Sequence, residues 1–357
     1  MTDQAGPVAT AQPGQPLAGA AMAALKFADG VERMVAVRRG ELVLDAALAA
    51  EVPILNQCRS GSCTSCLARL VEGEAVMRSG TGSSLTKSER DEGLRLLCLT
   101  EALTDCRFAI DYDSTAGTNR PVKVEAFVDA IDRVASDVVR LRLELAEGHW
   151  MDFRPGQFIQ FRIPGSDEVR SYSMASAPDE LPAIELLVRL LPSGAMSDWL
   201  RTGAAVDDVV ELEGPFGNFF LREKVRAPHV MIAGGTGLAP MMAMIDSLRK
   251  RAGRKPPVLL SFGCTRADGL FHLDALDLRR LWLPSLDLRI SVEQGEAGEG
   301  MLSGNPVAAV TAADAVEPDT VAYLCGPPGM IHGARSHLEA LGLKPENIFA
   351  EQFVASS

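Results

Sequence analysis

The chain has 357 residues, of which 47% are hydrophobic, so it is long enough for two or three domains with ordinary cores. Its net charge of −12 argues against nucleic acid and anionic membranes as partners, because phosphate binding needs a basic surface. No apolar run approaches the roughly 18 residues of a transmembrane helix, and the first residues lack the basic and apolar segments of a signal peptide. We therefore expect a cytoplasmic protein.

Two breaks in composition divide the chain. Residues 1–22 are rich in Ala, Gly, Pro and Gln, which predicts a disordered tail. The small polar stretch 114–121 is typical of a linker. A weaker break lies near residue 225, where charged residues precede an apolar strand. These breaks predict three units, at 23–113, 122–225 and 226–357.

The first unit holds a cysteine motif. The total of seven cysteines is odd and the chain lacks a secretion signal, so metal ligation is a better expectation than disulfides. Residues 58–66 read CRSGSCTSC, with the spacing C-x4-C-x2-C, and a further cysteine follows in LLCLT. This is the spacing of plant-type [2Fe–2S] clusters, whose sulfurs accept hydrogen bonds that tune the potential. The predicted ligands are Cys58, Cys63, Cys66 and Cys98.

Two alternatives to this ligand set remain open. A zinc site usually has paired C-x2–4-C units, whereas only one such short pair is present here. Cys106 could replace Cys98 as the fourth ligand, but it falls in an expected strand, where a lone cysteine is usually a small buried hydrophobic residue. Cys264 and Cys325 fall in another unit and are not candidates.

The middle unit predicts an antiparallel β-barrel, because several short, partly alternating runs are broken by Gly and Pro. These runs are 122–131, 138–145, 157–163 and 184–190.

The tetrapeptide RSYS, residues 170–173, lies in this unit and is consistent with flavin binding. Arg170 offers paired donors for a pyrophosphate, Tyr172 can lie flat against an isoalloxazine ring, and Ser173 can donate to flavin N5. Alone, the motif also fits a satisfied arginine and a core tyrosine. The segment 186–200, with a loop-to-helix start suited to phosphate, and the GPFG turn at 214–217 favour FAD. The predicted FAD residues are Arg170, Ser171, Tyr172, Ser173, Val188, Arg189, Gly194, Met196 and Ser197.

The last unit alternates buried strands with helical stretches, which predicts a parallel α/β sheet. GGTGLAP at 234–240 lacks the G-x-G-x-x-G spacing, yet it is a glycine turn between strand and helix that suits a pyrophosphate. CGPPGM at 325–330 places Cys325 at the carboxyl end of a strand, where such sheets bind ligands, although alone it would be a buried core cysteine. The predicted nucleotide residues are Gly235, Thr236, Gly237, Pro240, Cys325, Gly326 and Pro327.

The choice between NADH and NADPH depends on charge near the 2′ position, because NADPH needs a cation there. The strand LRISVEQ ends in the acidic Glu293, whereas CTRADG offers Arg266. We expect NADH.

In combination and in this order, CRSGSCTSC with LLC, RSYSMAS, GAMS, GGTGLAP and CGPPGM resemble the single-component reductases of bacterial oxygenases, such as benzoate and anthranilate dioxygenase reductases. The resemblance covers about 23–357. It implies a multidomain α+β and α/β protein, with a β-grasp [2Fe–2S] ferredoxin, an antiparallel β-barrel for FAD and a parallel α/β domain for NAD.

The resemblance also implies an activity. We expect electrons to pass from NADH through FAD and the [2Fe–2S] cluster to the terminal oxygenase of an aromatic dioxygenase. We also expect the reductase to be a monomer. The resemblance implies catalytic roles for Ser173, Cys325 and Phe353, the last as an aromatic that covers the flavin. The chain departs from the family by Thr64, where Gly is common, and by continuing past Phe353.

Three alternatives to an aromatic dioxygenase reductase stay open. The nearest is a reductase of a diiron monooxygenase, or of another NADH-fed redox enzyme such as a sugar dehydratase. The second is a permanent subunit of a larger enzyme, which should expose a large apolar patch. The third is a zinc-bound interaction protein.

Overall fold

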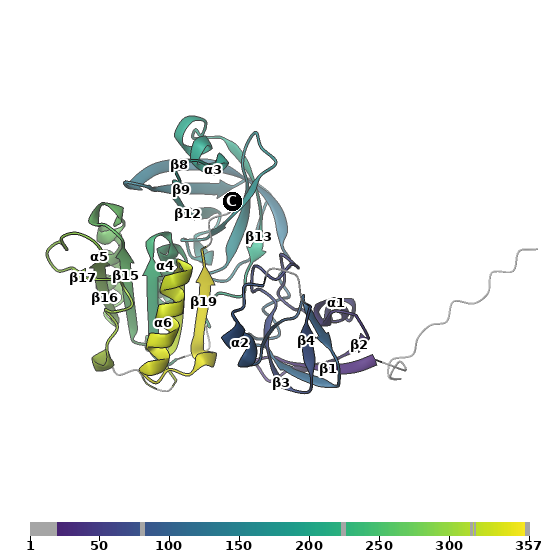
Figure 1. The fold of residues 1–357 in the computed structure, drawn as a ribbon. Coiled ribbons are helices and arrows are strands. Elements are labelled where there is room, and N and C mark those ends of the chain that lie inside the picture. The colour runs from purple at the N-terminus through teal and green to yellow at the C-terminus, as the bar shows by residue number, and fades with distance from the viewer. Residues whose placement is uncertain (1–19, 79–82, 223–225, 315–316, 318, 354–357) are drawn as a thin grey trace, which may run out of the picture. The chain divides into compact units, whose positions relative to one another are not determined.

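The computed structural model describes residues 20–78, 83–222, 226–314, 317 and 319–353. The chain forms two compact units, residues 1–118 and 119–357 (Figure 1). No helix in the described part of the chain is long and apolar enough to cross a membrane.

The first unit has the β-grasp fold, in which a sheet packs against a helix. Its described sheet has the strand order β2-β1-β7-β3-β5, with β1 and β7 parallel at its centre. Val43 and Leu44 begin the helix α1 and are fully buried, and α1 packs against β2 and β6. The elements are β1 (Ala20–Lys26), β2 (Glu32–Arg38), α1 (Val43–Ala49), β3 (Leu67–Glu72), β4 (Ala75–Met77), α2 (Lys87–Asp91), β5 (Leu94–Leu96), β6 (Thr100–Ala102) and β7 (Cys106–Ala109).

The ends of this unit differ from the sequence prediction. The predicted tail, 1–22, is wrong for its last three residues, which pair with β2; the rest lies outside the described residues. Alanine-rich composition favoured a tail, but small side chains also allow strand pairing. Part of the predicted linker also packs on the first unit. Ser114 Oγ donates to Asp29 Oδ2 at 2.7 Å, and a Cβ on Gly117 would come within 2.0 Å of the Pro53 carbonyl oxygen.

The first half of the second unit is the barrel that the sequence predicts. Its described strands follow the order β11-β10-β13-β8-β9-β12, and a bridge between Met174 and Leu186 links the two edges. Alternate residues point inward to an apolar core that includes Val124, Ala126 and Val128. The elements are β8 (Val122–Ala135), β9 (Val138–Leu145), β10 (Phe158–Arg162), β11 (Val169–Ser173), η1 (Pro178–Glu180), β12 (Ala183–Arg189), α3 (Ala195–Thr202) and β13 (Val209–Phe216).

The second half is a parallel sheet with the described order β17-β16-β15-β14-β18-β19. Met231 and Ala233 face the core under α4 and α5, while Val230 and Ile232 face the core under α6, so both faces are covered. The elements are β14 (His229–Gly234), η2 (Gly235–Gly237), α4 (Leu238–Lys250), β15 (Val258–Cys264), η3 (Ala267–Gly269), α5 (Leu273–Trp282), β16 (Leu286–Val292), β17 (Leu302–Ser303), η4 (Ala312–Asp314), β18 (Val321–Gly326), α6 (Pro328–Ala340), η5 (Pro345–Asn347) and β19 (Ile348–Gln352).

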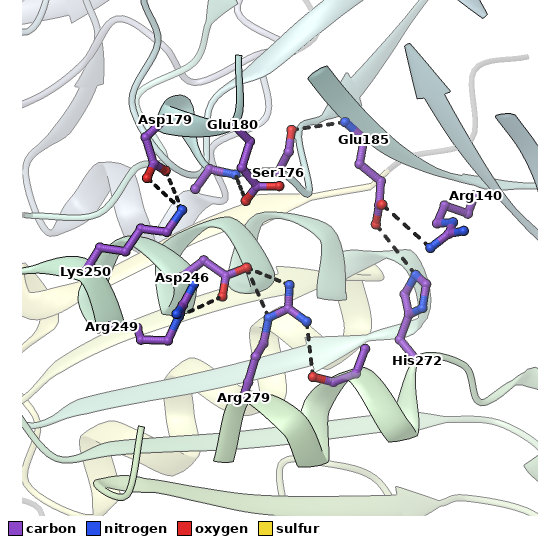
Figure 2. Close-up of polar contacts among 12 residues, drawn as sticks. Arg140, Ser176, Asp179, Glu180, Glu185, Asp246, Arg249, Lys250, His272 and Arg279 are labelled. Atoms are coloured by element: carbon purple, nitrogen blue, oxygen red, sulfur yellow. Dashed lines mark hydrogen bonds and ion pairs between the residues drawn. The ribbon is translucent and has the colours of Figure 1, made fainter. Parts of the chain in front are cut away.

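Polar side chains join the barrel to this parallel sheet (Figure 2). Lys250 Nζ of α4 lies 2.7 Å from Asp179 Oδ2 of η1, and His272 Nε2 lies 3.8 Å from Glu185 Oε1 of β12. Burial lowers the pKa of His272 to about 4, so this imidazole is neutral at pH 7 and its contact with Glu185 is not an ion pair.

The ion pair of Asp246 and Arg279 ties α4 to α5 and is almost fully buried. Arg279 Nη2 lies 2.6 Å from Asp246 Oδ2, and the two side chains are 16% and 6% exposed. We expect Asp246→Ala to lower the free energy of unfolding by about 3 kcal/mol, because the guanidinium stays buried without its carboxylate. The check is the thermal midpoint of flavin release from the full chain, followed by fluorescence.

The matched control for this prediction is Asp277→Ala on α5. Asp277 pairs with Arg280 at 3.0 Å, but both side chains are 56% exposed. Its loss should change stability by at most about 1 kcal/mol. Equal shifts in the two variants would contradict the prediction.

Candidate functional site

Three of the cluster cysteines lie on the loop between α1 and β3. Backbone N–H groups of Ser60, Ser62 and Cys63 all donate to Cys58 Sγ, at 3.4, 3.3 and 3.4 Å. Three donors converging on one sulfur favour its negative charge, which is the form that binds iron. The loop is thus shaped for thiolate ligation.

The four predicted ligands form two pairs. The backbone N–H of Cys58 donates to Cys63 Sγ, and that of Cys98 donates to Cys66 Sγ, each at 3.5 Å. Hydrogen bonding from the Cys63 thiol lowers the pKa of Cys58 to about 3, and bonding from Cys66 lowers the pKa of Cys98.

This pairing fits a centre with two irons. Among the described residues, no group of three or more His, Cys, Asp and Glu side chains is arranged to hold a single metal ion. In a [2Fe–2S] cluster, however, four cysteines serve two irons, so pairs rather than triplets are required.

Cys106, the alternative fourth ligand, makes hydrogen bonds with backbone carbonyl groups. Its thiol donates to the carbonyl oxygens of Glu74 and Thr104, at 3.2 and 3.1 Å. Burial raises the pKa of Cys106, as expected for a structural thiol. The geometry therefore favours Cys98.

Thr64, where the sequence resemblance implies glycine, adopts a left-handed backbone with φ of 54°. That conformation costs a β-branched residue roughly 1–2 kcal/mol, which explains why glycine suits the position. Here the loop accommodates threonine.

The predicted flavin residues gather on β11 of the barrel. Tyr172 is partly buried and meets Phe161 edge-to-face, at a centroid distance of 6.5 Å. Burial raises the pKa of its phenol, so the ring is neutral at pH 7. Arg170 pairs with Glu168, and Ser171 is exposed. Arg170, Ser171 and Tyr172 thus lie together on one short strand.

The second flavin segment, from β12 to α3, has some inward-facing residues. The side chains of Val188 and Met196 lie in the barrel core and are 1% and 4% exposed. A ligand could meet only their backbone. Gly194 precedes the first turn of α3, and the Ser197 hydroxyl accepts from the Leu191 N–H at 2.9 Å.

The two predicted nucleotide loops approach each other at the carboxyl ends of β14 and β18. A Cβ on Gly237 would lie 2.2 Å from the Cys325 carbonyl oxygen, so only glycine fits there. Gly235, Thr236 and Pro240 share this turn and the start of α4, and Gly326 and Pro327 follow Cys325 before α6. This backbone juxtaposition suits a nucleotide.

Glu351, on β19, is a site residue that sequence reasoning missed. Ser173 Oγ donates to Glu351 Oε2 at 2.7 Å, which links two residues 178 positions apart. Burial raises the pKa of Glu351 to about 7, although the Ser173 hydrogen bond opposes the shift. A carboxyl with this pKa can both accept and release a proton at pH 7.

Cys325 lies beside Glu351 on the neighbouring strand. Its side chain is fully buried in the core under α4, and burial raises the pKa of the thiol well above its usual value. Cys325 is therefore neutral at pH 7. Phe353 follows β19, is partly buried, and donates its N–H to the Gly326 carbonyl oxygen at 3.0 Å.

Three segments of the chain match known domain families. Residues 26–103 match the 2Fe-2S iron-sulfur cluster binding domain, 125–221 the oxidoreductase FAD-binding domain, and 231–336 the oxidoreductase NAD-binding domain. The chain is 34% identical over 331 residues to the 2-halobenzoate 1,2-dioxygenase electron transfer component of Burkholderia cepacia, covering 92% of this chain and 97% of the relative. The chain belongs to the family of oxygenase electron transfer reductases.

Other members of this reductase family serve different oxygenases. The chain is 32% identical over 333 residues to the propane 2-monooxygenase reductase component of Mycolicibacterium goodii, covering 89% of this chain and 94% of the relative. A solved cytochrome P450 reductase from Amycolatopsis matches with a TM-score of 0.70 and 29% identity, over 94% of this chain and 99% of that chain.

Membership of the reductase family confirms the sequence-based expectations for the fold class and for the cofactors, a [2Fe–2S] cluster, FAD and NADH. The chain is an oxidoreductase that transfers electrons. The residues present fit these groups, because the cysteines stand in two pairs, β11 carries donors and an aromatic ring, and the two glycine loops meet at the sheet edge.

Proposed function

We propose that this reductase carries electrons from NADH through FAD and the cluster of Cys58, Cys63, Cys66 and Cys98 to the terminal oxygenase of an aromatic dioxygenase. The observation that carries the proposal is the coexistence of two thiol pairs with the Ser173–Glu351 contact in a single chain. When bound, FAD supplies the conversion between the electron pair of NADH and the single electrons that a cluster accepts.

The protein's part in this reaction includes handling one proton. Each NADH that is oxidised by two one-electron acceptors yields one NAD⁺, two reduced acceptors and one proton. Ser173 Oγ can pass this proton to the carboxylate of Glu351, with which it is hydrogen-bonded. Arg170 and the N-terminus of α3 would orient phosphate groups, and the ring of Tyr172 would pack on the flavin. Phe353 would cover the flavin face and move aside for the nicotinamide.

The aromatic dioxygenase is preferred as the partner because the similar Burkholderia protein serves a dioxygenase of 2-halobenzoate. A second candidate is a monooxygenase, since the similar Mycolicibacterium protein serves a propane 2-monooxygenase. In either case we propose a monomeric reductase in the cytoplasm, with its first domain at 20–118 and the other two at 122–225 and 226–357.

The partner is tested by NADH-driven turnover with purified oxygenase components, followed together with optical and EPR spectra of the cluster. Substrate-dependent product with an aromatic dioxygenase, and none with a diiron monooxygenase, would support the proposal. The reverse result would assign the chain to the second candidate.

We also expect the reductase to prefer NADH. Arg266, at the end of β15, has an ion-pair partner in Asp268 at 3.5 Å, and the exposed Glu293 follows the neighbouring strand β16. The 2′-phosphate of NADPH would be repelled by the negative charges of Asp268 and Glu293. We predict that kcat/KM for NADH exceeds that for NADPH by at least about tenfold, which corresponds to roughly 1.4 kcal/mol.

Two variants refine the coenzyme prediction. Glu293→Gln should narrow the ratio of the two kcat/KM values by improving NADPH alone. Glu296→Gln, three residues further along and also exposed, should leave the ratio unchanged. A wild-type ratio near one would contradict the prediction.

A further inference from the structure

In the second unit, one arginine and four aromatic side chains form a continuous stack. Arg222 Cζ lies 4.1 Å from the ring centre of Phe220 and 4.3 Å from that of Phe349. The ring of Phe349 stacks on Tyr323, at 5.6 Å and 29°, and Tyr323 stacks on His229, at 6.0 Å and 19°. Arg222 is thus sandwiched between two aromatic faces.

The stack joins three parts of the chain. Arg222 and Phe220 belong to the segment that leaves the barrel, whereas Tyr323 and Phe349 belong to β18 and β19 of the parallel sheet. The backbone N–H of Arg222 donates to the Tyr323 hydroxyl at 2.9 Å, which fixes this segment against β18. His229, at the buried end, is neutral at pH 7 because burial lowers its pKa to about 4.

Side-chain contacts matter for strand β19 because main-chain pairing in the described sheet holds it on one side only. It is an edge strand of the described sheet and pairs only with β18 there. Because side chains alternate along a strand, Phe349, Glu351 and Phe353 point to one side. A clamp on Phe349 therefore fixes the direction in which Glu351 leaves the same strand.

We propose that Arg222 is a positioning residue for the electron-transfer reaction: by clamping Phe349, it holds β19 so that Glu351 reaches Ser173. A planar guanidinium suits this role, since both of its faces can stack while its edge donates hydrogen bonds. Here that edge donates to the carbonyl oxygens of Asn218 and Phe220, at 3.2 Å.

The surroundings of Glu351 show why its position matters. From the barrel it faces the Ser173 hydroxyl, and a Cβ on Gly217 would lie 3.8 Å from Glu351 Oε1. From β18 it faces the neutral thiol of Cys325. A small displacement of β19 would replace these neighbours with water and return the carboxyl toward its ordinary pKa.

This inference rests on the proposed role of Ser173 and Glu351. The experiment measures turnover of the holoenzyme against pH with a one-electron acceptor, for wild type, Arg222→Met and Arg222→Lys. We expect the midpoint of the rise near pH 7 to fall by about one unit or more in Arg222→Met, toward the pH of about 4.3 expected of an ordinary glutamate. Arg222→Lys, which keeps the charge but loses the planar faces, should give an intermediate shift.

Arg249→Met is the matched control, because Arg249 also stacks on an aromatic ring, that of Trp282 at 4.8 Å, but lies on α4 away from β19. Its pH midpoint should equal that of wild type. Phe349→Leu keeps an apolar side chain but removes the aromatic ring that Arg222 contacts, so it should reproduce the shift even if the Arg222 variants do not fold.

The outcomes separate this inference from the proposed function. An unchanged midpoint in flavin-loaded Arg222→Met or in Phe349→Leu, alongside loss of the pH dependence in Glu351→Gln, would overturn the role of Arg222. If Glu351→Gln itself kept the wild-type pH dependence, the proposed role of Ser173 and Glu351 would fail instead.

Discussion

Replacing Cys98 with serine is expected to abolish the optical and EPR signals of the cluster while NADH still bleaches the flavin at the wild-type rate. Cys98 lies beside Cys66 as one of two thiol pairs, and a serine hydroxyl is a far weaker iron ligand than a thiolate. The residues proposed to act in flavin reduction lie in the other compact unit. Anaerobic stopped-flow absorbance and EPR of the NADH-reduced protein provide the two measurements.

Cys106→Ser is the control for this experiment. Both cysteines are buried, but the Cys106 thiol donates to two carbonyl oxygens, which a serine hydroxyl can also do. The Cys106→Ser variant should keep its cluster. Loss of the cluster from Cys106→Ser but not from Cys98→Ser would make Cys106 the fourth ligand. Loss of flavin reduction in Cys98→Ser would contradict the expectation that the flavin is reduced independently of the cluster.

Replacing Glu351 with glutamine is expected to lower turnover with one-electron acceptors by on the order of 10²-fold and to remove its rise through neutral pH. In the proposed reaction, the ionised carboxylate of Glu351 accepts the proton from Ser173. Because the pKa of Glu351 is raised to about 7, this form grows as the pH rises through 7, and turnover should grow with it. Glutamine cannot ionise, so its profile should be flat there.

Glu346→Gln is the matched control, since Glu346 is exposed and lies five residues earlier in the same module. It should keep both the rate and the pH dependence of the wild type. Steady-state rates from about pH 5.5 to 8.5, which span the pKa on both sides, decide between the outcomes. A Glu351→Gln enzyme that still gained activity through pH 7 would rule out this carboxyl as the proton acceptor.

Local sequence patterns were sufficient for most of the fold and for the cluster loop. The spacing of Cys58, Cys63 and Cys66 predicts their proximity, because nine residues cannot separate them far. Alternation along β8 and β9 predicts strands with one buried face, and the structure has them. The same alternation predicts that the side chain of Val188 lies in the barrel core with that of Leu186, which leaves its backbone for the proposed flavin contact.

The contact of Glu351 with Ser173 could not be predicted in this way. It depends on β19 pairing with β18 and on the barrel meeting that sheet edge, which are long-range facts. The only local signal was the spacing of Phe349, Glu351 and Phe353 at every second residue, which places an acid between two aromatics on one side of a strand. The position of Arg222 could not be predicted either, because it depends on the packing of the segment after β13 against β18 and β19.

The positions of the proposed functional residues along the chain limit where two such reductases can be joined to make a chimeric protein. All four predicted cluster ligands lie within residues 1–118, so an exchange of parts at 118/119 would transfer the proposed one-electron carrier whole. A junction between β13 and β14 would instead take Ser173 from one parent and Glu351 from the other. Hybrids built there would combine the two residues of the proposed proton path from different parents, so we expect them to transfer electrons more slowly than either parent.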